Sequence, residues 1–395
     1  MKSLLHPRRA LALALALSVT APALAETFTV AVVPDPQNYN DETQAQPQGV
    51  NTFIQQMQYL LDSRAERNLV FTTFVGDIVQ HGDGNFVQKL DDGSRKQWSG
   101  HAEWDGAERA ISLLDQAGIP FGMVPGNHDY DNAGVQNHHD PKAPQALAGG
   151  STWEHYFGPQ SKHFAGKSWY GGSFNQGMNS YQLFSAGGID FLALSLEMEP
   201  TPAALDWAQQ VLDSHPKLPV IVTTHAWLQP VSKPGAEQRG NWHDAYFAGT
   251  DHLPADQVWD RFIRRNRMIF LVLCGHDFTP ANNGMSQGEN LRVDHNDAGL
   301  PVYQVLQDYQ GDTRGPDGQA NSAHGGAGWL RFIEFDTEQH TLHFSTWSPL
   351  LGRYAGRNGE KTFGVDPYYS DFSVAFPPQL APDPIHPPSH GSITR

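Results

Sequence analysis

Five short groups of polar residues could carry chemistry in this chain, and most follow an apolar run that is typical of a β-strand. In chain order they are Asp35-Pro36-Gln37, Gly76-Asp77, Gly126-Asn127-His128-Asp129, His225 and Gly275-His276. Ligands bind at the carboxyl ends of the strands in an open α/β sheet, so these groups are expected to converge on one rim. Carboxylate, amide and imidazole donors gathered there can hold two divalent cations and a water, which suits hydrolysis of a phosphate ester.

No single group supports this interpretation by itself. An isolated Gly-Asp pair is usually a turn, and an isolated His after a strand is more often structural than a metal ligand. The order favours a metal site, because a cation-binding residue follows each of the apolar runs TFTVAVV, LVFTTFV, IPFGMV, LPVIVTT and MIFLVLC. Motifs in such a context are hypotheses that the spatial arrangement must confirm.

The same order resembles the calcineurin-like metallophosphoesterase superfamily, whose pattern runs D-x-H, GD, GNH-D/E, H and GHxH. Here the matching residues read D-x-Q at 35–37, GD at 76–77, GNHD at 126–129, H at 225 and GHDF at 275–278. The segments LQDYQ (306–310) and GGAGWLRFIEFD (325–336) also resemble secreted bacterial members. The resemblance implies an α/β fold, a calcineurin-like four-layer αββα sandwich with its metal site at the carboxyl ends of strands.

The resemblance also implies the function of an exported metal-dependent phosphoesterase, in which a metal-bound hydroxide attacks the phosphorus of a mono- or diester. The implied ligands of two divalent metal ions are Asp35, Gln37, Asp77, Asn127, His225 and His276. Asp77 would bridge the ions, with Asp35 and Gln37 on one ion and Asn127, His225 and His276 on the other. His128 would stabilise charge or protonate the leaving oxygen, and Asp129 would orient it by accepting a hydrogen bond.

Two departures from the pattern alter the first metal site. Gln37 stands where the family usually has a His, and Phe278 stands where it has the second His of GHxH. Because oxygen donors then dominate, manganese or magnesium is favoured over zinc or iron. His81, His243 and His252 are candidates to fill the gap, although each is more simply explained as a surface loop residue.

Two other classes of function stay open. A degenerate family member could bind a metal or another ligand with little or no catalysis, and Phe278 favours this alternative. A carbohydrate-binding or periplasmic ligand-binding protein of α/β build is the other, although it has no need of ordered metal ligands. Metal content together with turnover of a phosphate monoester and a diester would separate these classes.

The N-terminal residues predict the compartment. Residues 1–25 read as a secretory signal peptide, with cations at Lys2, Arg8 and Arg9, the apolar run ALALALALSV and a small-x-small site before Glu26. The protein is therefore expected to be exported, periplasmic or secreted, by a Sec or twin-arginine route. Residues 26–376 are expected to form one metallophosphoesterase domain, and the Pro-rich residues 377–395 a disordered tail.

Charge and composition narrow the partners. The formal net charge is −16, and loss of the three signal-peptide cations makes it more negative still, which argues against a nucleic-acid-binding surface. A phosphorylated small-molecule or macromolecular substrate remains compatible, because bound metal inverts the local field. No later stretch approaches ~20 apolar residues, so no membrane anchor is expected. Cys274, the single cysteine, is expected in the core.

Apolar spacing also predicts the supporting elements. Helices are expected around residues 53–61, 111–114, 205–212 and 258–263, between the strands already described. The stretches 78–100, 130–180 and 226–252 are rich in Gly, Asn, His and Trp, and we expect them to be loops that build the pocket wall. His138-His139-Asp140 could line that pocket or form a solvated loop, and Trp227 could line it or pack in the core.

Overall fold

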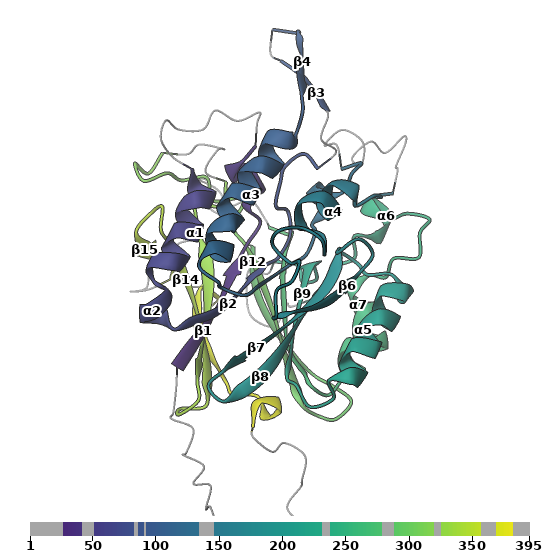
Figure 1. Cartoon of the computed structure of the whole chain (residues 1–395), viewed down its shortest axis with the longest axis vertical. Helices are drawn as coiled ribbons and strands as arrows, with labels where there is room; N and C mark the ends of the chain where they lie inside the picture. The colour runs from purple at the N-terminus through teal and green to yellow at the C-terminus, as the bar shows by residue number, and fades with distance from the viewer. Residues whose placement is uncertain are drawn as a thin grey trace, which may run out of the picture.

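A computed structural model describes residues 27–41, 51–82, 86–90, 92–133, 146–230, 238–278, 288–319, 325–356 and 369–381. Within them, two seven-stranded sheets lie face to face, with helices on both outer sides (Figure 1). The expected signal peptide and His138-His139-Asp140 lie outside the described residues. No helix in the described part of the chain is long and apolar enough to cross a membrane.

The first sheet carries the first three ligand groups. Its strand order is β15-β14-β13-β1-β2-β5, and β16 pairs with β14. The bounds are β15 (Arg353–Tyr354), β14 (Thr341–Ser348), β13 (Leu330–Asp336), β1 (Thr27–Val33), β2 (Leu69–Phe74), β5 (Phe121–Met123) and β16 (Asp371–Ala375). Strands β1, β2 and β5 are parallel neighbours, so their carboxyl ends meet at one edge.

The second sheet carries the remaining groups. Its order is β11-β12-β10-β9-β8-β7-β6. The bounds are β11 (Gly288–His295), β12 (Pro301–Asp308), β10 (Ile269–Gly275), β9 (Val220–Ala226), β8 (Ile189–Leu196), β7 (Asn179–Ala186) and β6 (Tyr170–Phe174). Strands β8, β9, β10 and β12 are parallel, and every residue of β9 and β10 is buried, as expected of central strands covered on both faces.

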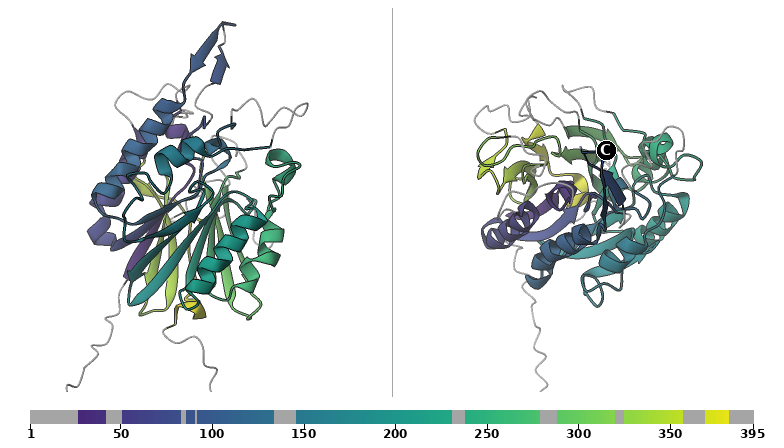
Figure 2. Two further views of the ribbon diagram at one scale, coloured as in Figure 1. Left: turned by 45° about the vertical axis from the view of Figure 1, so that its right-hand side comes forward. Right: turned by 90° about the horizontal axis from the view of Figure 1, so that it is seen from above.

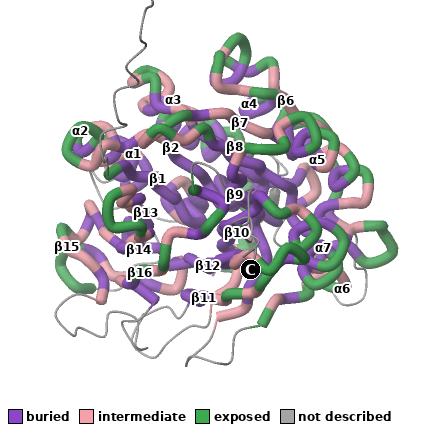
Figure 3. The backbone as a smooth tube through the Cα atoms, turned by 90° about the horizontal axis from the view of Figure 1, so that it is seen from below, coloured by how far each residue is buried: buried purple, intermediate pink, exposed green. Residues whose placement is uncertain are grey.

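Three apolar clusters define four layers, which confirms the expected αββα sandwich. Between the sheets lie Phe28, Phe71, Phe191 and Phe270 with their neighbours. On the outer face of the first sheet pack α1 (Thr52–Asp62) and α3 (His101–Gln116), and on that of the second pack α5 (Pro202–Ser214) and α7 (Ala255–Arg261). Figure 2 shows these two helical layers on opposite sides, and Figure 3 shows the buried centre between them.

The stretches expected as loops contain regular structure. The hairpin β3 (Phe86–Lys89) and β4 (Arg95–Trp98) projects from the molecule in Figure 1. Helix α4 (Ser151–Phe157) and strand β6 lie in the second stretch, and α6 (His243–Tyr246) lies in the third. The smaller elements are α2 (Arg64–Arg67), η1 (Pro36–Tyr39), η2 (Asn127–Asp129) and η3 (Ile263–Arg265).

The expected start of a disordered tail at residue 377 is wrong for its first residues. Residues Pro378–Leu380 form the short helix η7, and both Gln379 and Leu380 are buried. Leu380 belongs to the cluster between the sheets, while Gln379 Nε2 donates to the Pro301 carbonyl at 3.1 Å. Burial of the Leu380 side chain and the hydrogen bond from the Gln379 amide nitrogen keep this segment on the domain, and residues 382–395 lie outside the described part.

Candidate metal centre

The carboxyl ends of five parallel strands bring the expected ligands together. Asp35 follows β1, Asp77 follows β2, and Asn127 opens η2 after β5. From the second sheet, His225 is the penultimate residue of β9 and His276 follows β10. Side-chain contacts join these residues across the two sheets, so the rim predicted from the apolar runs exists.

Asp35, Asp77 and His225 form the tightest group. One donor atom from each lies within 4.8 Å of the other two, and all three side chains are buried. His225 Nε2 lies 3.3 Å from Asp77 Oδ1, and His225 Nδ1 lies 3.7 Å from Asp35 Oδ1. Two carboxylates and an imidazole at this spacing are a recognisable cation-binding set.

Asn127 and His276 extend this group. Asn127 Oδ1 lies 3.0 Å from His225 Nε2 and 2.9 Å from His276 Nδ1, and the two ring nitrogens lie 3.1 Å apart. His225 Nδ1 is 2.8 Å from the Val75 carbonyl, which requires that nitrogen to carry the proton. Nε2 of the neutral ring then turns its lone pair toward two oxygens, an arrangement that a cation at this point would satisfy.

Two buried oxygens of the first site have no hydrogen-bond partner among the described residues. They are Asp35 Oδ2 and Gln37 Oε1. The Gln37 amide nitrogen donates to Asp77 Oδ2 at 3.1 Å and to Gln310 Oε1 at 2.6 Å. Because an unpaired buried oxygen costs free energy, these atoms fit a site completed by a hard cation.

The backbone is shaped around the site. Asp35, Asp77 and His276 have φ values of 38°, 51° and 78°, which non-glycine residues seldom adopt. Such conformations concentrate where the surroundings hold a functional group in place. The neighbouring glycines are required by space, because a Cβ on Gly275 would lie 2.1 Å from Asp35 Oδ2, and one on Gly126 would lie 2.1 Å from Asp77 Oδ1.

Buried negative charge dominates the electrostatics. Burial raises the pKa of Asp35, and the nearby Asp308 and Asp77 carboxylates raise it further. Burial also raises the pKa of Asp129 to about 7, with the Asp77 charge adding to the effect. Burial opposes ionisation of Asp77 too, but His225 and His128 hold its pKa below the usual range. An excess of buried carboxylates is stabilised by bound cations.

His128 and Asp129 are arranged differently from the expected pair. The Asp129 carboxylate accepts hydrogen bonds from the backbone N–H groups of Gly126 (2.8 Å), Ile78 (3.1 Å) and Val79 (3.0 Å). His128 Nδ1 lies instead 2.8 Å from the Gln80 carbonyl. Asp129 therefore fixes the two loops that carry Asp77 and Asn127, because a carboxylate between three N–H donors pairs with the backbone rather than with a ring.

The orientation of His128 depends on a further buried group. The Glu103 carboxylate of α3 accepts hydrogen bonds from the backbone N–H groups of Gln80 at 3.0 Å and His81 at 2.8 Å. Glu103 also lies 2.8 Å from His81 Nδ1, and with Asp41 these residues form a second buried His–carboxylate cluster. His81 thus belongs to this cluster and is buried, contrary to the surface interpretation.

The other histidine candidates also lie elsewhere. His243 is next to Asp244, with 3.4 Å between Nδ1 and Oδ1, and the His252 ring stacks on Phe247 at 3.9 Å. Cys274 is fully buried, as expected. Trp227 packs in the outer cluster and donates to Gln304 Oε1 at 2.9 Å, which favours the packing interpretation.

Aromatic side chains that the sequence did not single out cover the site. The Trp242 ring lies 4.9 Å from the His276 ring and perpendicular to it, and the Tyr246 ring lies 5.5 Å away. Both come from the stretch 226–252, so the expectation that it contributes to the site wall is confirmed. The backbone N–H of Trp242 is fixed by Glu199 Oε1 at 2.8 Å.

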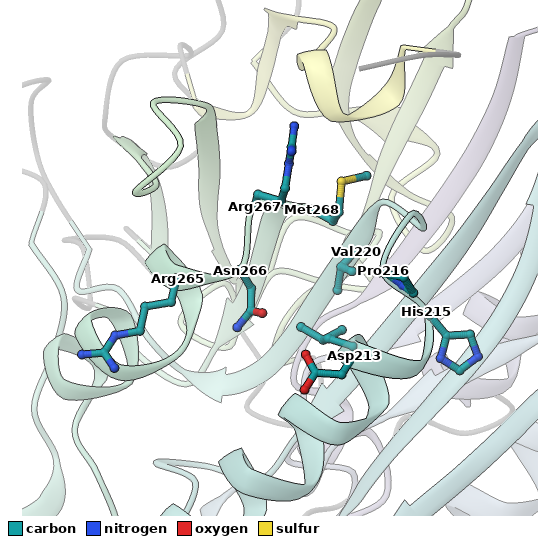
Figure 4. Close-up of a pocket in the computed structure, with 9 residues that line it drawn as sticks. Asp213, His215, Pro216, Val220, Arg265, Asn266, Arg267 and Met268 are labelled. Atoms are coloured by element: carbon teal, nitrogen blue, oxygen red, sulfur yellow. The ribbon is translucent and has the colours of Figure 1, made fainter. Parts of the chain in front are cut away.

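A cavity of about 210 Å³ lies at the opposite edge of the second sheet. Figure 4 shows its lining from the end of α5, the start of β9 and the segment before β10, including Asp213, His215, Arg265 and Met268. These are the amino ends of strands whose carboxyl ends carry His225 and His276. The cavity is therefore separate from the metal-binding rim.

The chain is similar to several known proteins. The calcineurin-like phosphoesterase family profile matches residues 28–280. The uncharacterized protein YvnB of Bacillus subtilis (strain 168) is 28% identical over 302 residues, which are 76% of this chain but 18% of that protein. The chain thus spans about a fifth of this relative's length. A structure titled GAP50, the anchor in the inner membrane complex of Plasmodium, matches with a TM-score of 0.39 and 15% identity, over 83% of this chain and 86% of that one.

Proposed function

Because the chain belongs to the calcineurin-like phosphoesterase family, we propose that it is an exported metal-dependent enzyme that hydrolyses phosphate mono- or diesters. The observation that carries the proposal is the convergence of Asp77, Asn127 and His225, since His225 Nε2 lies 3.0 Å from Asn127 Oδ1 and 3.3 Å from Asp77 Oδ1. A binding protein has no need of the adjacent His128, whereas a hydrolase has a use for an acid beside its metals.

Two cations would be held by this chain's own donors. Asp77 lies between the halves of the site, since its Oδ1 contacts His225 and its Oδ2 contacts Gln37. Asp35 and Gln37 contribute oxygens on one side, and Asn127, His225 and His276 contribute donors on the other. When bound, two divalent ions clamp the attacking and leaving oxygens and lower the pKa of a water. Manganese or magnesium is the proposed metal, because oxygens dominate the first half.

The protein groups would divide the remaining work. Nδ1 of His128 lies 2.8 Å from the Gln80 carbonyl, so Nδ1 holds a proton there, and Nε2 would be the ring atom that acts on a substrate. His128 would donate a proton to the leaving oxygen or stabilise its charge. The Trp242 and Tyr246 rings would limit water and present an apolar wall to the group esterified to phosphate.

The export part of the proposal depends on residues 1–25. Their basic start, apolar middle and Ala23-Leu24-Ala25 end follow the pattern of a cleaved secretory signal. Mass spectrometry of the protein recovered outside the cytoplasm should find Glu26 at the N-terminus. An intact Met1 in the cytoplasmic fraction alone would contradict export without touching the enzymatic proposal.

A metal-binding protein with little catalysis is the second candidate. It is favoured by Phe278, which offers no donor, and by Gln37, whose amide nitrogen faces Asp77. Turnover of p-nitrophenyl phosphate and its diester separates the candidates. The chelator-treated protein should be inactive and regain turnover with added Mn²⁺ or Mg²⁺. Full metal loading with no turnover of either ester would favour the binding protein.

A further inference from the structure

Strand β12 ends at the same rim as β10 and carries a buried carboxylate there. Cys274 of β10 pairs with Leu306 of β12 in parallel register. His276 and Asp308 each follow these paired residues by two positions, so they leave neighbouring strands at the same level. Asp308 is fully buried. The fold therefore brings a further buried oxygen donor to the same rim, on a strand that the five groups did not include.

Hydrogen bonds connect Asp308 to the first half of the metal centre. Gln310 Nε2 donates to Asp308 Oδ2 at 3.1 Å, and Gln310 Oε1 accepts from Gln37 Nε2 at 2.6 Å. The same Gln37 nitrogen donates to Asp77 Oδ2 at 3.1 Å. Two amide side chains thus link the Asp308 carboxylate to the carboxylate that lies between the two halves of the site.

The charges point to a cation at this end. Asp308 and Asp77 are both charged neighbours of Asp35, so three buried carboxylates lie in one region. Asp35 Oδ2 and Gln37 Oε1 also lack a hydrogen-bond partner among the described residues. Buried carboxylates gathered in this way need a counter-charge, and oxygen donors of this kind suit a hard divalent ion.

We propose that Asp308 is a ligand of the first metal ion and takes the place of the imidazole that Phe278 does not supply, with Gln310 orienting Asp308 and Gln37. This inference rests on the proposed two-metal function. The resulting donors, Asp35, Gln37, Asp77 and Asp308, are all oxygens, which selects manganese or magnesium over zinc. The LQDYQ segment (306–310) at the end of β12 would then supply both the metal ligand Asp308 and the orienting residue Gln310.

Metal binding, rather than activity, tests the assignment. The chelator-treated full chain is titrated with Mn²⁺ by calorimetry, and the Mn²⁺ spectrum is followed by electron paramagnetic resonance. Wild type should bind two ions per chain and show the spectrum of an exchange-coupled pair. Asp308→Asn should keep one ion, lose the coupled spectrum and bind the other ion at least about tenfold more weakly.

Asp312→Asn is the matched control, because Asp312 is equally buried four residues later but pairs with Arg314 and Trp329. It should retain two coupled ions. If Asp308→Asn does not fold, Gln310→Ala should weaken the same ion by a smaller factor. Unchanged binding of both ions in a folded Asp308 or Gln310 variant would overturn the inference, as would a wild type that binds fewer than two ions. Two coupled ions in wild type that Asp308→Asn fails to retain, without phosphate-ester turnover by wild type, would uphold Asp308 and refute the proposed function.

Discussion

At the scale of single residues, the side chains of the site turn acceptor atoms toward one another, and too few hydrogen-bond donors lie between them. Asp77 contacts His225 and Gln37 through different oxygens, and the backbone N–H of His128 donates to Asp77 Oδ1 at 3.0 Å. Asn127 Oδ1 contacts two imidazoles. These contacts identify Asp77 as the common member of both halves, and they leave Gln37 as a neutral contributor to one.

The first prediction compares those two residues. Asp77→Asn should lower kcat by about 100-fold or more, whereas Gln37→Ala should lower it by about tenfold, because only Asp77 supplies a charged oxygen to both ions. Steady-state kinetics at saturating Mn²⁺, with circular dichroism to verify folding, measure the difference. Equal losses in two folded variants would remove the bridging role from Asp77.

The second prediction concerns His128. His128→Ala should bind metal as wild type does, yet lose about 10²- to 10⁴-fold in kcat, because the ring lies beside the ligands and acts on the leaving oxygen. The loss should be larger for an alkyl phosphate than for p-nitrophenyl phosphate, whose leaving group needs no proton. Metal analysis and kinetics on both esters measure these effects.

Glu103→Gln supplies a milder variant for the same test. It weakens the anchoring of the Gln80 backbone, and so of the carbonyl that orients His128, without touching a proposed ligand. Its loss of kcat should also be larger for the alkyl phosphate than for p-nitrophenyl phosphate, and smaller than the loss in His128→Ala. A His128→Ala protein that lost metal would show that this ring is a ligand, and equal losses on both esters would exclude proton donation to the leaving oxygen.

At the scale of elements, parallel strands and tight turns aim the ligands. Strands β1, β2, β9 and β10 each end within three residues of a ligand, and left-handed backbone at Asp35, Asp77 and His276 turns the chain at three of these ends. Gly126 and Gly275 let neighbouring segments approach closer than a Cβ permits. The helical layers support this rim from outside.

The third prediction uses His163, which packs between Phe121 and Phe157 and has no hydrogen-bond partner among the described residues. Burial lowers its pKa to about 4, from an ordinary 6.5. As the pH falls from 6.5 to 4, His163 therefore becomes protonated in the unfolded chain while it stays neutral in the folded chain. Full stability is present above this window, and up to about 3 kcal/mol is lost across it.

His163→Phe should remove this contribution while filling the aromatic pocket. Urea unfolding at pH 7 and pH 5, each with chelator, gives the change in unfolding free energy for both proteins. The wild type should lose more stability than the variant between the two pH values. Parallel losses would mean that His163 is protonated in the folded protein.

At the scale of the whole molecule, much of the framework could be predicted from the sequence. Apolar runs that end in ligand-capable residues predicted the strands and the rim where Asp35, Asp77 and His225 meet, and the family resemblance predicted the sandwich. The pairing of Asp129 with backbone N–H groups was not, because a motif specifies residue types but not their partners. Nor was the arrival of Asp308 at the same rim as His276, which depends on the register of β12 with β10.

The central claim is that one rim holds two metal ions around Asp77, and diffraction from Mn²⁺-soaked crystals tests it most directly. Anomalous difference maps should show two peaks ~3.5–4 Å apart with Asp77 between them. One peak should lie among Asn127, His225 and His276, and the other near Asp35. A single peak, or two peaks away from Asp77, would contradict the account.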